Sequence, residues 1–128
     1  MSQPIVFISH SRIKEGAAGA FREMVAQMYP TLEKSLPLTV AHMGFYNEDE
    51  TEVTFIHVFP DAAAMEAHME GGAARATAAY EYIETLGFEV YGPASEAGLR
   101  GLQEAAAAGV PLTVVPDAIG GYLRLNPA

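Results

Sequence analysis

The stretch VTFIHVFPDAAAMEAHM, residues 53–69, decides how the chain is expected to fold. Its first seven residues are β-branched, aromatic or apolar except for His57, and such a run is typical of a strand. Pro60 then ends the strand, and Asp61 can accept backbone N–H groups as the N-cap of a helix. The alanine-rich remainder favours that helix and carries His68. The stretch therefore predicts a strand that turns directly into a helix, with one histidine on each.

The residues that precede this stretch predict a strand, a helix and a second strand. Residues 4–11, PIVFISHS, are typical of a strand, and residues 38–46 form a second run that pairs with 52–59 around the polar turn NEDET. Pro30 is expected to end or kink the helix predicted over 14–35. One apolar face of that helix recurs at three- and four-residue spacing: Phe21, Met24, Val25, Met28 and Leu32.

The residues that follow complete a ferredoxin-like pattern. Gly71 and Gly72 are expected to break the second helix, because glycine costs about 1 kcal/mol per helical position relative to alanine. The helical pattern resumes over 73–86, and residues 87–93, GFEVYGP, predict a fourth strand. The order strand, helix, strand, strand, helix, strand is the split βαβ arrangement of an α+β, ferredoxin-like domain.

A C-terminal extension lies beyond this unit. We expect residues 1–94 to form the ferredoxin-like domain and residues 95–128 to add a helix and a β-hairpin. The helix is predicted over 95–108, and the hairpin strands are GVPLTVV, 109–115, and GGYLRL, 120–125. The hairpin is too apolar for a free tail, so it is expected to pack on its own domain or on a partner subunit.

Composition excludes several classes of protein. The 128 residues are 50% hydrophobic, which suits one domain with its own core, and no run of about 18 apolar residues predicts a membrane span. The N-terminus has no signal-peptide pattern and cysteine is absent, so a cytoplasmic location is expected. A net charge of −9 without a basic cluster would repel phosphate backbones, so nucleic acid is not an expected partner.

Both faces of the predicted sheet are apolar. In the strand at 52–59, one face carries Val53, Phe55, His57 and Phe59, and the other carries Thr54, Ile56 and Val58. Two helices can cover only one face of such a sheet, so the second face needs another cover. A second copy of the sheet would supply it and make the protein a homodimer; the alternative is that the C-terminal extension folds over this face.

These features resemble the dimeric α/β-barrel superfamily, and within it the antibiotic-biosynthesis-monooxygenase-like group. The resemblance covers residues 4–92 and is carried by Phe59, Asp61, Ala64 and His68, together with RIKEGAAGAFREM, which has Gly16 at the helix entry. The chain departs from the group in having Phe59 where tryptophan is frequent and His57 where glutamate is common.

The resemblance implies a dimer whose two sheets form a barrel, with a pocket between sheet and helices in each subunit. Some members oxidise polycyclic aromatic substrates with O₂ and without metal or flavin. Others degrade haem, isomerise lactones or have no known activity, so the fold constrains the chemistry weakly.

The histidines are the main chemical candidates. None of the four, His10, His42, His57 and His68, falls in an HxH, HxxxH or HExxH pattern, so we expect neither a metal site nor another cofactor. His68, and after it His57, are the candidate proton acceptors, provided that His57 is on the helix-facing side of the sheet. The alternative for both is a packed histidine with a satisfied hydrogen bond.

An apolar pocket is expected around these histidines. Flexible methionines and aromatic side chains suit an adaptable cavity, although at helical spacing they are also ordinary core residues. The predicted function is a small homodimer whose pocket takes a small hydrophobic, aromatic or polyketide-like ligand, as in cofactor-independent monooxygenases; the alternative is a non-catalytic binding or stress-related dimer of the same fold. The candidate ligand-binding residues are Met24, Met28, Met43, Phe59, Met65 and Tyr80.

Overall fold

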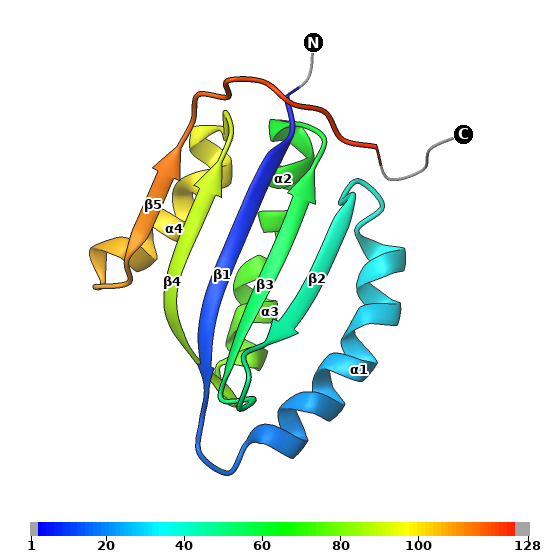
Figure 1. Ribbon diagram of the computed structural model, residues 1–128, viewed down its shortest axis with the longest axis vertical. Helices are drawn as coiled ribbons and strands as arrows, with labels where there is room; N and C mark the ends of the chain where they lie inside the picture. The colour runs from blue at the N-terminus through cyan, green and yellow to red at the C-terminus, as the bar shows by residue number, and fades with distance from the viewer. Residues whose placement is uncertain (1–2, 125–128) are drawn as a thin grey trace.

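A five-stranded sheet forms the centre of the computed structural model, which describes residues 3–124 (Figure 1). The strands lie in the order β2-β3-β1-β4-β5. The first four are antiparallel to their neighbours, and β5 runs parallel to β4. This α+β arrangement confirms the predicted ferredoxin-like fold with a C-terminal helix and β extension. The strands are β1 (Ile5–Ile13), β2 (Ala41–Tyr46), β3 (Glu52–Phe59), β4 (Ile83–Tyr91) and β5 (Leu112–Val115).

Helices α2, α3 and α4 lie behind one face of the sheet in Figure 1, and α1 runs beside its β2 edge. Buried side chains form two clusters: Phe21 of α1 packs with Phe55, and Met65 of α2 packs with Phe7 and Phe59. The helices are α1 (Ala18–Ser35), α2 (Ala62–Met69), α3 (Gly72–Ala79) and α4 (Glu96–Ala107).

The turn that leads from β3 into α2 forms as expected. The Asp61 carboxylate accepts a hydrogen bond from the backbone N–H of Ala64, at 2.9 Å, and so caps α2. The predicted break also forms, because Gly71 adopts a φ of 77° between α2 and α3. A residue with a side chain is strained in that left-handed conformation, so glycine allows the chain to change direction there.

Helix α1 continues to Ser35 as predicted, so Pro30 does not end it; proline removes only one helical N–H, and Leu32 in the following turn is buried. One predicted boundary is wrong. The second helical stretch ends at Ala79 and not near residue 86, because Ile83 and Thr85 pair with β1 as the beginning of β4. Strand pairing outweighs helix propensity at these residues.

The C-terminal extension adds to the same core. Ser95 caps α4 through the N–H of Gly98, and Leu102 of α4 packs in one cluster with Met65. The first predicted hairpin strand forms as β5, but residues 116–124 contain no strand, so the described part of the extension forms no hairpin. Leu125, the last residue of the second predicted strand, lies outside the described residues.

One face of the sheet has no helix over it among residues 3–124 (Figure 1). Met43 and Phe45 of β2 are exposed on this open face, and their neighbours on β1 and β3 are only half-buried. The extension leaves them uncovered: Ile119 and Tyr122 are exposed too. No helix among residues 3–124 is long and apolar enough to cross a membrane.

Candidate functional site

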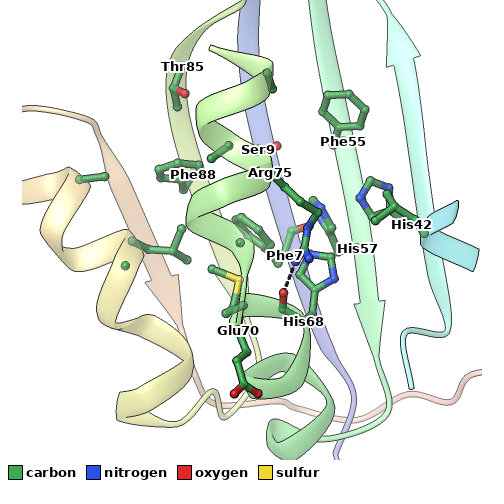
Figure 2. Close-up of a pocket in the computed structure, with 18 of the residues that line it drawn as sticks. Phe7, Ser9, His42, Phe55, His57, His68, Glu70, Arg75, Thr85 and Phe88 are labelled. Carbon is green, nitrogen blue, oxygen red and sulfur yellow. Dashed lines mark hydrogen bonds between the residues drawn. The ribbon is translucent and has the colours of Figure 1, made fainter. Parts of the chain in front are cut away.

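A cavity of about 830 Å³ lies between the sheet and the helices. Its walls are mostly apolar and come from the strands and from all four helices, including Phe55, Phe88 and Leu102. Figure 2 shows that polar groups gather at one end, where Arg75 lies over His57 and His68. Phe88 and Thr85 lie toward the other end in the same view. The volume falls in the range of 300–1,000 Å³ that is typical of small-molecule sites.

Three histidines from three elements meet at the polar end. His42 of β2 is directly opposite His57 of β3 in the strand register, and α2 brings His68 over both. The ring centroids lie 4.3 Å apart for His42 and His57, 5.0 Å for His57 and His68, and 5.8 Å for His42 and His68. His57 is therefore on the helix-facing side, as the sequence analysis required for a shared cavity.

Each of these histidines has a partner at its Nδ1 atom. His57 donates from Nδ1–H to the carbonyl oxygen of Phe7, at 2.8 Å, and its ring stacks on the Phe7 ring with centroids 4.5 Å apart. His42 Nδ1 lies 2.9 Å from the hydroxyl of Tyr29, and His68 Nδ1 lies 3.5 Å from the hydroxyl of Thr39. The hydrogen bond to Phe7 leaves Nε2 of His57 as an unprotonated acceptor in the neutral ring.

The environment keeps the three rings neutral. Burial is the main cause that lowers the pKa of both His42 and His68 to about 4, and the positive charge of Arg75 adds to it. Burial also holds the pKa of His57 well below its ordinary value, followed by repulsion from His42. Near pH 7 the cluster therefore presents lone pairs rather than positive charges.

Arg75 is the cation of the site. Its guanidinium donates a hydrogen bond to the carbonyl oxygen of His68, and the side chain is only half-exposed. Of the carboxylates that line the cavity, Glu66 accepts a hydrogen bond from Ser95, and Glu70 points away from the histidines in Figure 2. Arg75 is thus placed to attract an anionic group of a ligand toward the imidazoles.

The candidate ligand-binding residues divide into three groups. Met24, Met28 and Tyr80 line the cavity. Met65 and Phe59 do not line it, because both are fully buried in the core; Phe59 packs against the His68 ring. Met43 lies on the open face, since side chains alternate along a strand and its neighbour His42 points toward the helices.

Sequence reasoning chose neither His42 nor Arg75 as a site residue. Counting outward from the NEDET turn pairs residue 42 with residue 56, whereas the structure pairs His42 with His57, so no sequence signal pointed to His42. The expectation of no metal site rested on the absence of short ligand spacing in the sequence. That ground no longer holds, because the fold brings together three histidines that are 15 and 11 positions apart.

Solved structures with the same fold support the resemblance. MupZ from Pseudomonas fluorescens superposes with a TM-score of 0.73 at 19% identity, over 99% of this chain and 100% of its own. SnoaB from Streptomyces nogalater, a cofactor-independent oxygenase, gives a TM-score of 0.58 at 19% identity, over 70% of this chain and 92% of its own. The protein SO0527 from Shewanella oneidensis gives 0.55 at 26% identity, over 70% and 88%.

No protein-family model matches the sequence, and comparison with curated proteins found no relative. The structural neighbours nevertheless confirm that the chain shares the ferredoxin-like α+β fold of MupZ and of the cofactor-independent oxygenase SnoaB. The match to MupZ extends this likeness over the C-terminal extension.

Proposed function

We propose that this cavity binds a small aromatic or polyketide-like molecule with an acidic ring hydroxyl, and that the protein oxidises it with O₂ without an organic cofactor. The observation that carries the proposal is the combination of an apolar cavity with three neutral imidazoles and one guanidinium at the same end. The cofactor-independent oxygenase SnoaB, which shares the fold, supports the choice of chemistry.

The reaction needs no external reductant. A ring CH₂ that is activated by the hydroxyl becomes a carbonyl: one oxygen atom of O₂ enters the substrate, and the other leaves as water with the two hydrogens of the carbon. All four electrons come from the substrate. The slow step is electron transfer from the electron-rich phenolate to O₂, so the protein has to favour the phenolate, orient the ring and exclude water.

Deprotonation is the step for which the site is suited. His68 is neutral near pH 7 and can accept the hydroxyl proton, with His57 as the next candidate. An imidazolium with a pKa of about 4 is a stronger acid than a phenol, so transfer to His68 alone is unfavourable. Arg75 offsets this, because its positive charge stabilises the phenolate that forms.

Replacing His68 with glutamine is expected to lower turnover of a phenolic substrate at least about tenfold, the low side of general-base contributions. Glutamine keeps a polar side chain of similar size but cannot accept and release the proton. Oxygen uptake with a panel of polycyclic phenols and anthrones measures the effect. His10→Gln is the matched control, because His10 lies on the open face and pairs with Glu89. Unchanged turnover in a destabilised His68→Gln protein would make His68 a packing residue.

A non-catalytic binding protein is the second candidate. The low pKa of His68 and His42 favours this function, because weakly basic imidazoles accept a hydrogen bond from a ligand but do not readily take its proton. Thermal stabilisation by phenols without oxygen uptake would support binding alone.

The open face is proposed as the interface of a homodimer. Exposed Phe45 and Met43 and the half-buried Ile56 and Val58 form an apolar surface that a second copy would cover. Phe45→Glu is expected to weaken dimerisation at least about a hundredfold, because it buries an unpaired charge in the interface. Sedimentation at micromolar concentration measures this, with Gln27→Glu on exposed α1 as the control. A wild-type monomer at that concentration would contradict the proposal.

A further inference from the structure

We propose that His42, His57 and His68 bind one divalent transition-metal ion, of which zinc is the best-suited. One ring nitrogen from each residue lies within 4.8 Å of the other two. Three points this close fit within a circle whose radius is 4.8 Å divided by the square root of three, about 2.8 Å. Zinc–nitrogen bonds are about 2.0–2.1 Å long, so each ring needs to move inward by less than about 1 Å. The inference goes beyond the proposed oxidation and concerns the same three side chains.

The backbone already directs the three rings to one point. The register between β2 and β3 places His42 and His57 in a directly opposed pair, and the capped start of α2 fixes the position of His68. His57 and His68 are buried, and His42 is partly buried at the cavity wall. Because two of the ligands stand on sheet strands and the third on a capped helix, little ordering is left for the ion to impose.

The outer partners of the rings fit metal ligation. Histidine ligands usually donate their second ring N–H to a carbonyl, carboxylate or water, which fixes the tautomer and leaves the other nitrogen free for the metal. His57 makes this contact with the Phe7 carbonyl, at 2.8 Å. The hydroxyls of Tyr29 and Thr39 stand in the equivalent position for His42 and His68.

Three imidazoles leave further coordination positions open toward the cavity. Among residues 3–124 no carboxylate completes the set, since Glu70 points away and Glu66 is bonded to Ser95. Open positions are characteristic of sites that bind water or a ligand group rather than of closed structural sites. Arg75 repels the ion, but it also attracts an anion that would occupy the open position. The chemical class of the bound group is therefore an anionic oxygen, such as a phenolate, carboxylate or hydroxide.

The experiment is a titration of tag-free, chelator-treated protein with Zn²⁺ by calorimetry and with Co²⁺ by visible absorption, in the absence of substrate. We expect one ion per chain and the intense visible bands of low-coordinate cobalt. His42→Gln and His68→Gln should each weaken binding at least about a hundredfold, and His10→Gln should leave it unchanged. His57→Gln is omitted as a test because His57 supports the core. Arg75→Met should tighten binding, since it removes the repelling charge.

Sub-stoichiometric binding, or binding that survives in both His42→Gln and His68→Gln, would overturn the metal proposal. Each of these outcomes leaves the proposed oxidation standing, because oxygen uptake is measured separately on metal-free protein. The converse outcome is a protein that binds zinc, with weaker binding in His42→Gln and His68→Gln, and yet consumes no oxygen. That result would support the metal site and refute the proposed oxidation.

Discussion

Acidification from pH 7 to pH 5 is expected to lower the free energy of unfolding by about 3 kcal/mol or more. The pKa of both His42 and His68 is about 4 in the folded protein, and that of His57 is also well below its ordinary value. In the unfolded chain the three titrate near pH 6.5. Between these values the unfolded state binds protons that the folded state does not, so stability falls as the pH falls. Each histidine contributes a slope of up to about 1.4 kcal/mol per pH unit.

Urea unfolding at half-unit steps from pH 7.5 to 4.5 measures this slope. Above about pH 7 the three histidines are neutral in both states, so their contribution should be flat. Removing one titrating ring, as in His42→Gln, should reduce the slope by about a third, whatever the stability of the variant at pH 7. His10→Gln is the control, because His10 lies outside the cluster. Equal unfolding free energies at pH 7 and pH 5 would mean that the rings are not held neutral by burial.

His57→Ala is expected to destabilise the fold by about 2–4 kcal/mol. The His57 side chain is buried, stacks on Phe7 and donates to the Phe7 carbonyl from the adjacent strand. Alanine leaves a cavity beside the Phe7 ring and removes a hydrogen bond from a buried carbonyl oxygen. Both losses act in the same part of the core, and neither can be replaced by a neighbouring side chain without repacking.

Urea midpoints at pH 7.5 measure this effect, since protonation then adds nothing. The control is Tyr122→Ala, which truncates an exposed aromatic side chain outside the core and should cost less than about 1 kcal/mol. A His57→Ala protein within about 0.5 kcal/mol of wild type would show that the stacked ring and its hydrogen bond contribute little, and that the His57 position is free to serve the cavity alone.

Local sequence signals determined most of the fold. The alternation in residues 53–59, the Asp61 cap and the Gly71-Gly72 break each depend on backbone chemistry within a few residues, and the structure contains all three. The apolar character of both sheet faces is equally a property of strand alternation. The ferredoxin-like sheet follows from these features, because the split βαβ order allows few other sheets.

The conformation of some segments depends on contacts with residues distant in sequence, which compete with the local preference for helix or strand. For these segments only the tertiary structure decided the conformation. Pro30 stays within α1 because Leu32 is packed, and residues 83–86 form a strand because β1 offers them backbone partners. Helix propensity carries no information about either partner. The same holds for the hairpin predicted at the C-terminus, where β5 joins β4 as a parallel edge strand.

In the candidate site, too, the sequence indicated some residues and only the fold brought in the others. Sequence alone indicated His57 and His68 as residues of a shared pocket, since they flank one tight turn. The third histidine and Arg75 required the complete fold: a strand register places His42 beside His57, and α3 carries Arg75 over His57 and His68. The low pKa values likewise arise from burial and from Arg75, which no local pattern encodes. Sequence spacing fixes which residues share a helix or strand. The distances between residues on different elements depend on how those elements pack, and the binding of a metal ion or a ligand depends on those distances.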